Sequence, residues 1–352
     1  MKDGIKPLLR SYGKQAAISG ALEVSSLLGA AGLLPGARGR GAVFTLHHVR
    51  PHLPRPFEPN RHLEIAPEFL DLAIRQLKRD GYVFVALDEL PALLDGPGNL
   101  PPFAAFTLDD GNRNNAEHAL PVFERHQVPF TVFVCRGLSE RTHGMWWETL
   151  AALLGALDRV TFDFGQGEET LELRTPTQKQ SAFDAFAAYV HSTDEAEAVA
   201  AIGRLAQSHG VDPLGIVERL IMDGDELKRL VENPLASLGA HTLSHRALAR
   251  LCEAEAAAEM VLSADYVATL TDRRPSTLAY PYGTPGAVSK REARLASELG
   301  FKVAVTTQPG TISPEPGMPL THLPRLSLNG HFQKPRYVSA LASGIPFRLK
   351  AR

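Results

Sequence analysis

The chain has 352 residues, a length that fits two average domains or one large α/β barrel with an insertion. Its composition is 44% hydrophobic and 22% charged with a net charge of −2, which argues against a nucleic-acid partner because such proteins present a basic face. The two cysteines, Cys135 and Cys252, are too few for a disulfide framework. No apolar run of about 18 residues occurs, so we expect no transmembrane helix and a cytoplasmic protein.

Residues 1–40 differ in composition from the remainder. Residues 6–34 are rich in Ala, Leu, Ser and Gly, and the basic residues of this part are Lys2, Lys6, Arg10 and Lys14. This composition predicts a helix that either packs on the body or lies on a membrane surface, so residues 1–36 are a candidate for peripheral membrane contact. Residues 35–41, which contain Pro35 and three glycines, are typical of a linker.

From residue 41 onward, strand patterns and helix patterns alternate. Helical spacing of apolar residues occurs at 67–80, 87–94, 116–126, 250–270 and 289–299. Strands are expected at 42–46, 82–86, 103–108, 129–134, 235–239, 277–280, 301–306 and 322–328. The alternation predicts an α/β fold, a distorted (β/α) barrel of about seven parallel strands with its helices outside.

Residues 148–230 interrupt this alternation. They contain a possible hairpin at 161–174 followed by a long helical pattern rich in Ala and Glu. We interpret them as a mainly helical insertion in the barrel, with its charged residues on solvated helix faces. The predicted organisation is therefore an N-terminal helical segment and linker at 1–40 and a barrel at 41–352 with an insertion at about 148–230.

The apolar stretch 103–108 ends at Asp109, Asp110 and Gly111. Neighbouring side chains on a strand point to opposite faces, so the two carboxylates can share one face only if the backbone turns there. Gly111 permits such a turn at little steric cost. The alternative is an ordinary Asp-Asp-Gly turn that closes a strand.

Two histidines, His241 and His245, follow the strand predicted near 235–239. They can aim their imidazoles at one point if a helical turn begins there. Two imidazoles and one carboxylate form a divalent metal site with open positions for water or substrate. Alternatively, either histidine caps a strand or binds a loop carbonyl.

Polar groups follow other predicted strands in the same way. His47 and His48 come after the first strand. Tyr282 stands between Pro281 and Gly283, and the fixed φ of Pro281 stiffens this turn. Because the carboxyl ends of parallel barrel strands meet on one face, all these residues are expected on one rim. The adjacent pair Trp146 and Trp147 is suited either to stacking on a sugar ring or to core packing.

Three motifs carry a family resemblance. Thr-Leu-Asp-Asp-Gly, His-Thr-Leu-Ser-His and Tyr-Pro-Tyr-Gly, in that order, resemble the main motifs of the polysaccharide deacetylase (NodB-homology) family, carbohydrate esterase family 4, over residues 41–330 outside the insertion. The resemblance implies that Asp109 is the catalytic base and that Tyr282 supplies a backbone N–H to the oxyanion. It implies one divalent metal ion, Zn²⁺ ahead of other first-row ions, held by Asp110, His241 and His245.

The sequence departs from the family pattern at two places. The usual arginine two residues before the motif-three proline is Ala279 here, and no Leu-x-His follows His245. A similar strand occurs at the front and ends at His47, as in the circularly permuted branch that includes deacetylases of biofilm poly-N-acetylglucosamine. The resemblance to that branch implies that His47 is the general acid, whereas His48 stands where the branch usually has Asp.

Arg325 lies in the last predicted strand, which neighbours the first strand in a closed barrel. A guanidinium grips a carboxylate in bidentate fashion, which a lysine cannot do. We therefore predict that Arg325 replaces the missing arginine by pairing with Asp109 or a nearby acid. The alternative is a structural ion pair elsewhere.

The sequence thus leads to three functional hypotheses. The first is a metal-dependent hydrolase that removes an N-acetyl group from an N-acetylhexosamine in a polysaccharide, oligosaccharide or glycolipid precursor. The second is a metal-dependent hydrolase of a small non-sugar amide. The third is a saccharide-binding barrel without turnover, because Ala279 removes one usual catalytic support.

Overall fold

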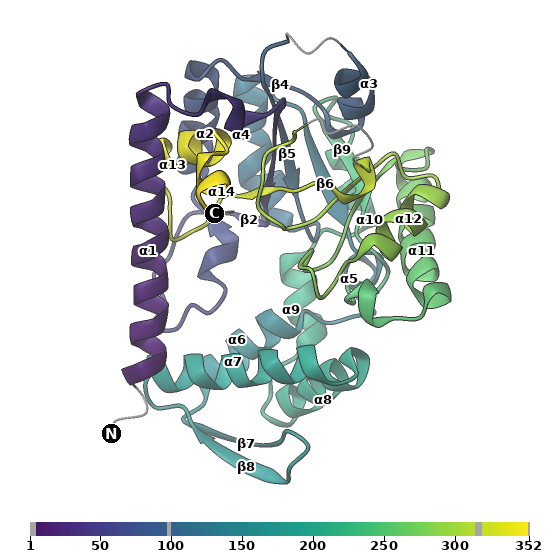
Figure 1. Ribbon diagram of the computed structural model, residues 1–352. Coiled ribbons are helices and arrows are strands. Elements are labelled where there is room, and N and C mark those ends of the chain that lie inside the picture. Colours follow the sequence, from purple (N-terminus) through teal and green to yellow (C-terminus); the bar gives the residue numbers. More distant parts are fainter. Residues whose placement is uncertain (1–4, 97–99, 314–318, 351–352) are drawn as a thin grey trace.

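The computed structural model describes residues 5–96, 100–313 and 319–350, and its centre is a sheet of eight strands in which every pairing is parallel (Figure 1). β4 (Val83–Phe84) belongs to this sheet as a side strand that pairs with β5 and stands outside the main strand order. Across the sheet, the path runs through β11 (Val303–Val305), β10 (Thr277–Ala279), β9 (Ala236–Ala240), β6 (Phe130–Val134), β5 (Phe103–Leu108), β1 (Gly41–Leu46) and β12 (Leu326–Ser327).

The two ends of this path approach each other. Val305 of β11 forms a parallel bridge with Leu323, and the Leu323 N–H donates to the Ala304 carbonyl. The sheet is therefore a distorted (β/α) barrel, as predicted. The strand predicted at 322–328 is too long, since only Leu326–Ser327 form β12; Pro324 has no N–H and cannot continue a ladder.

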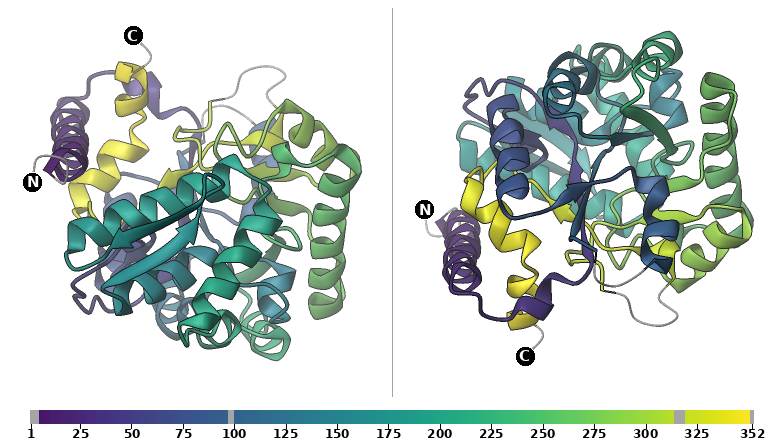
Figure 2. Two further views of the ribbon diagram at one scale, coloured as in Figure 1. Left: turned by 90° about the horizontal axis from the view of Figure 1, so that it is seen from below. Right: turned by 90° about the horizontal axis from the view of Figure 1, so that it is seen from above.

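The predicted alternation of strands and helices is present outside the insertion. All six residues of β1 and of β5 are buried, as expected for strands covered on both faces. The helices that flank the barrel are α2 (Pro67–Arg79), α3 (Leu90–Asp95), α4 (Leu120–His126), α5 (Arg136–Ser139), α10 (Gly224–Leu230), α11 (Glu253–Thr271) and α12 (Lys290–Glu298) (Figure 2). In α2, the five residues at the predicted apolar spacing, from Phe69 to Leu77, are all buried.

Shorter elements join these parts. β2 (His48–Val49) pairs with β3 (Glu64–Ile65) directly after β1. A π-helix, η4 (Asn115–Ala119), precedes α4, so the predicted helix at 116–126 has two sections of different pitch. The 3-10 helices are η1 (Pro35–Arg38), η2 (Arg61–Leu63), η3 (Leu87–Glu89), η5 (Leu248–Arg250) and η6 (Leu320–His322).

The insertion is a helical layer below the barrel in the view of Figure 1. It consists of α6 (Trp146–Ala156), the antiparallel hairpin β7 (Arg159–Asp163) and β8 (Glu168–Glu172), α7 (Pro176–Ser192), α8 (Glu195–Ser208) and α9 (Pro213–Leu220). Trp146 and Trp147 belong to its buried apolar cluster together with Cys135, which follows β6. The insertion therefore packs on the rim where the barrel strands end. The domain division at residues 40 and 41 stays a prediction.

The N-terminal helix α1 (Ile5–Ala30) runs beside α13 (Pro335–Ala342) and α14 (Ile345–Lys350) (Figure 1). Leu22 is buried in a cluster with Tyr337, and the Glu23 carboxylate accepts hydrogen bonds from Arg336 and Tyr337. One face of α1 thus packs on the body. Lys2, which is part of the predicted membrane segment, lies outside the described residues. Among those residues, no helix is both long and apolar enough to cross a bilayer.

Candidate active site

The Asp-Asp-Gly motif turns the chain sharply after β5. Asp110 has φ 74°, a left-handed conformation that is uncommon for residues other than glycine, and Gly111 also has φ 74°. The turn therefore begins at Asp110, one residue before the glycine. Asp109 and Asp110 are both 2% exposed, so this turn brings two carboxylates into the interior at the end of one strand.

The two motif histidines converge through a loop, and not through the helical turn that was considered as a way to align them. Residues 241–247 form no helix, and both Thr242 (φ 64°) and His245 (φ 59°) are left-handed. Local hydrogen bonds replace those of a helix: the His245 N–H donates to Thr242 Oγ1, and the Glu259 carboxylate accepts from the N–H groups of residues 243 and 244. Left-handed residues held in this way are concentrated at functional sites.

Asp110, His241 and His245 form a candidate metal site. Their ligand atoms all lie within 4.8 Å of one another. Asp110 Oδ1 is 3.5 Å from His241 Nε2 and 3.4 Å from His245 Nε2. Ligands bound tetrahedrally at about 2.0–2.2 Å are roughly 3.3–3.6 Å apart, so the spacing fits an ion such as Zn²⁺.

Two further observations support a metal ion at this position. Asp110 Oδ1 is buried and has no hydrogen-bond partner among the described residues, although orphaned buried polar atoms are costly. His241 Nδ1 lies 2.8 Å from the Ala279 carbonyl, which fixes that nitrogen as the donor and leaves Nε2 with a lone pair toward Asp110. Burial would raise the pKa of Asp110, but the adjacent imidazoles of His241 and His245 hold this pKa well below its usual value.

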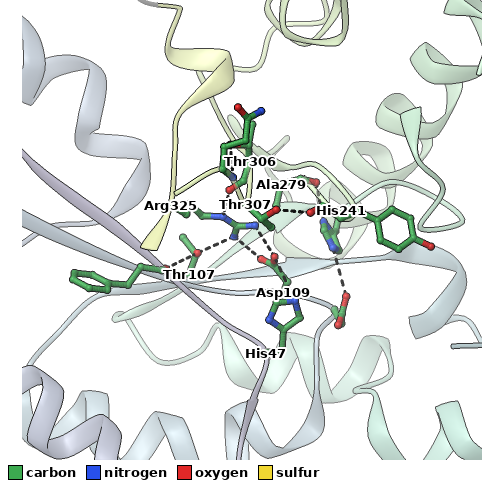
Figure 3. Close-up of polar contacts among 12 residues, drawn as sticks. His47, Thr107, Asp109, His241, Ala279, Thr306, Thr307 and Arg325 are labelled. Carbon is green, nitrogen blue, oxygen red and sulfur yellow. Dashed lines mark hydrogen bonds and ion pairs between the residues drawn. The ribbon is translucent and has the colours of Figure 1, made fainter. Parts of the chain in front are cut away.

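Arg325 forms a bidentate ion pair with Asp109 from the segment before β12, which is separated from β5 by β1 alone (Figure 3). Its Nη1 and Nη2 each lie 2.7 Å from one carboxylate oxygen of Asp109, and it also donates to Thr107 Oγ1 and the Thr306 carbonyl. Arg325 is fully buried and stands one residue before β12. The structure thus contains the predicted pairing of Arg325 with Asp109, in place of the arginine that the family usually has where this chain has Ala279. The catalytic role of Arg325 stays a proposal.

Arg325 also determines the charge of Asp109. Burial would raise the pKa of Asp109, but the adjacent guanidinium lowers it below its ordinary value. Asp109 is therefore an ionised, oriented carboxylate that lies next to the candidate metal site and is not one of its three residues.

His47 lies beside Asp109 (Figure 3). Its Nε2 is 3.9 Å from Asp109 Oδ2, and its side chain is 20% exposed. Asn115 of the π-helix donates to the His47 carbonyl and so holds the chain after β1 in place. Desolvation lowers the pKa of His47 despite the opposing effect of Asp110 and Asp109.

His48 has a different environment from His47. It is 1% exposed, its Nδ1 lies 2.9 Å from Asn114 Nδ2, and its Nε2 lies 3.9 Å from Glu148 Oε1. Burial lowers the pKa of His48 to about 3, so the ring is neutral and accepts a hydrogen bond from Asn114. His48 thus helps to join the first strand to the turn that follows β5.

Glu148 should make stability depend on pH. Burial raises its pKa from 4.5 to about 7, so the folded state keeps a proton that the unfolded state loses as the pH rises through this window. Stability is therefore lost between pH 4.5 and about 7, by at most about 3 kcal/mol. We expect Glu148→Gln to raise Tm above wild type at pH 8 and to leave it nearly unchanged at pH 4.5.

The control for this comparison is Glu169→Gln, at an exposed position of β8. It should shift Tm equally little at both pH values in thermal melts. A Tm difference between Glu148→Gln and wild type that does not vary with pH would contradict the assignment.

Tyr282 is held by the insertion. Its backbone is left-handed, with φ 59°, and its hydroxyl donates to Glu195 Oε1 at 2.7 Å and accepts from Trp146 Nε1 at 2.9 Å. Its ring packs against His245 with centroids 5.1 Å apart. The Tyr282 N–H has no hydrogen-bond acceptor within the described parts of the chain, as a donor reserved for a ligand would require.

Sequence reasoning missed several residues that position this site. Glu195 was assigned to a solvated helix face, yet it is 5% exposed and bonds Tyr282. Glu259 holds the histidine loop, and Asn114 and Asn115 hold the segment after β1. The asparagines within four residues after the Asp-Asp-Gly motif were the available signal, whereas no local pattern marks either glutamate.

Fold and site together define a class of protein, a parallel (β/α) barrel with a candidate Asp-His-His metal site and an arginine-bound aspartate at the strand ends. Residues 159–304 match the model of the family described as polysaccharide deacetylase. This segment contains His241, His245 and Tyr282 and begins after Asp109 and Asp110. The match confirms the resemblance to polysaccharide deacetylases. No curated protein matches the sequence.

Solved structures share the fold at low sequence identity. The Streptococcus pyogenes deacetylase PplD, solved in complex with acetate, is 18% identical with a TM-score of 0.53 and aligns over 82% of this chain and 92% of its own. IcaB from Ammonifex degensii is 16% identical with a TM-score of 0.54 over 88% and 98% of the two chains. BC0361, a polysaccharide deacetylase from Bacillus cereus, is 15% identical with a TM-score of 0.52 over 86% and 68%.

Proposed function

We propose that the protein is a metal-dependent hydrolase that removes the N-acetyl group of an N-acetylhexosamine in a polysaccharide, oligosaccharide or glycolipid precursor. The observation that carries this proposal is that two adjacent carboxylates, Asp109 and Asp110, have different neighbours. Asp110 faces two imidazoles, and its neighbour Asp109 is gripped by Arg325 next to His47. The match to polysaccharide deacetylases supports the saccharide as substrate.

The reaction adds water across the amide C–N bond and yields acetate and a free amine. A divalent ion held by Asp110, His241 and His245 would polarise the acetyl carbonyl and acidify water. Asp109, ionised and oriented by Arg325, takes a proton from the attacking water. The Tyr282 N–H is the proposed donor to the developing oxyanion.

The departing amine needs a proton, and His47 is the proposed source. Its Nε2 lies 3.9 Å from the Asp109 carboxylate, and its side chain is 20% exposed. An imidazole that is neutral at rest can accept a proton during the reaction and pass it to the amine nitrogen, so its lowered pKa is compatible with this role.

Metal analysis of the purified protein, combined with acetate release from a panel of N-acetylated sugars and small non-sugar amides, tests the proposal. We expect one bound divalent ion per chain and acetate release from the sugars. Release from the non-sugar amides alone would identify a different amidase. Saccharide binding by a metal-saturated protein without acetate release would show a binding barrel instead.

We also propose that α1 contacts a membrane surface through its outer face. Val24 and Leu27 are 50% and 72% exposed, although the opposite face packs on α13. The basic residues near its start suit anionic lipids.

Substituting both exposed residues, Val24→Ser and Leu27→Ser, should lower co-sedimentation with vesicles containing anionic lipid by at least about tenfold, because buried apolar area drives such binding. The matched control is Leu53→Ser, a 76% exposed leucine outside α1, which should sediment as wild type does. Equal sedimentation of all three proteins would mean that α1 serves only to cover the body.

A further inference from the structure

A single carboxylate of the insertion, that of Glu195, reaches two segments of the proposed active site. Glu195 stands in the first turn of α8 and is 5% exposed. Its Oε1 accepts from the Tyr282 hydroxyl at 2.7 Å, and its Oε2 accepts from the Ala247 N–H at 2.9 Å. Tyr282 is the proposed oxyanion donor, and Ala247 stands two residues after the candidate ligand His245. Glu195 therefore links the two segments through one side chain.

The turn at Tyr282 has a backbone conformation that needs support from its surroundings. Tyr282 has φ 59°, and the Gly283 N–H donates to the Pro281 carbonyl at 2.6 Å. A positive φ together with a hydrogen bond that spans three residues is the pattern of the classic γ-turn, which is rare and strained. Residues in such conformations persist only where other contacts hold them in place.

Two sets of contacts hold this turn. On the backbone side, Thr307 Oγ1 donates to the Tyr282 carbonyl, and the Thr307 N–H donates to the Gly283 carbonyl. On the side-chain side, the Tyr282 hydroxyl lies between Glu195 Oε1 and Trp146 Nε1. The angle φ is the rotation about the N–Cα bond, so the direction of the Tyr282 N–H is fixed only when the rest of the residue is fixed. Glu195 thus contributes to that direction.

The hydrogen bonds at the Tyr282 hydroxyl leave little freedom for a different partner. Trp146 Nε1 can only donate, so it occupies the hydroxyl oxygen as an acceptor. The hydroxyl hydrogen then needs an acceptor of its own, which is Glu195 Oε1. The other oxygen of Glu195 is taken by the Ala247 N–H, and Arg250 Nη1 lies 3.8 Å from it. A carboxylate, with an acceptor at each end, satisfies both donors at once.

We propose that Glu195 is a positioning residue for the proposed hydrolysis. It holds the strained turn so that the Tyr282 N–H points toward the oxyanion as charge develops there. It acts through the Tyr282 hydroxyl and requires no contact with the substrate. The proposal rests on the proposed function for the reaction itself, and it gives the insertion a part in turnover in addition to its packing on the barrel rim.

Glu195→Gln tests this role, because glutamine has nearly the same shape and one acceptor fewer. Its amide oxygen can keep the Ala247 N–H, but its NH₂ group then faces the Tyr282 hydroxyl as a second donor. We expect kcat to fall at least about tenfold, with KM within about twofold of wild type and metal content unchanged, because the N–H contributes only in the transition state. Glu197→Gln, an exposed position two residues further along α8, is the control and should behave as wild type.

Tyr282→Phe shows whether Glu195 acts through the hydroxyl. This variant keeps the backbone N–H and removes the hydroxyl, so kcat should fall by a factor similar to that of Glu195→Gln. Adding Glu195→Gln to Tyr282→Phe should then lower kcat by less than about twofold, because two residues that act as one unit are not additive. Effects that multiply in the double variant would overturn the proposal. A lower Tm for Glu195→Gln at wild-type kcat would show that Glu195 serves the fold only.

A spectrum of the protein with ¹⁵N-labelled tyrosine separates this proposal from the proposed function. The chain has seven tyrosines, and the Tyr282 amide signal is the one that Tyr282→Phe lacks. We expect this signal to shift in Glu195→Gln and to stay in place in Glu197→Gln. If wild type releases no acetate, a shifted signal still supports the hold of Glu195 on the turn, and only the proposed function fails. A Tyr282 signal that is identical in wild type and Glu195→Gln would overturn that hold at any level of turnover.

Discussion

Alanine at Asp110, His241 or His245 is expected to abolish tight divalent-metal binding and hydrolysis together. Each residue offers one of three candidate ligand atoms that lie within 4.8 Å of one another, and catalytic zinc sites use three protein ligands and leave a position open. Loss of the ion removes the main stabiliser of the oxyanion, so we expect kcat to fall by at least about 10²–10³. Metal content by mass spectrometry and acetate release measure the two losses.

The adjacent aspartate provides the matched comparison. Asp109→Asn leaves the three ligands in place and removes the base, so the metal should stay near one equivalent while kcat falls by about 10²–10⁴. Both aspartates are 2% exposed and adjacent in sequence, so burial does not distinguish them. If Asp109→Asn lost metal as completely as Asp110→Ala, the division of roles between the two acids would be wrong.

Arg325→Lys is expected to lower kcat by about tenfold to a hundredfold with metal content unchanged. The arginine spans both oxygens of Asp109 at 2.7 Å and reaches the Thr306 carbonyl, and a single ammonium cannot make all three contacts. Asp109 would then be free to rotate toward the ion and to lose its function as a base. Lysine keeps the positive charge, whereas alanine would leave a buried carboxylate unpaired at a cost of about 3–5 kcal/mol.

Arg336→Lys is the control, because it makes the same replacement at another bidentate pair, with Glu23, between α13 and α1. Arg336 is 54% exposed and outside the site, so kcat should not change. Thermal melts of both variants separate lost stability from lost turnover. A lower Tm for Arg325→Lys at wild-type kcat would show that Arg325 is structural only.

The sequence by itself was enough to predict the helices and strands that depend only on the pattern of neighbouring residues. The all-buried strand β5 and the apolar spacing of α2 follow from the order of side chains along a few turns of chain, and both formed where predicted. The position of Asp109, Asp110, His241 and His245 at strand ends is also local. Because parallel strands share one carboxyl rim, that position was enough to bring these residues to one face.

Only the tertiary structure decided how those residues are held. The histidines meet through left-handed residues because Glu259, from α11, replaces the hydrogen bonds of a helical turn. Arg325 and Asp109 are 216 residues apart, and Glu195 reaches Tyr282 from the insertion. Such contacts depend on the packing of distant segments and the burial of their charges, and neither quantity is encoded in the spacing of neighbouring residues.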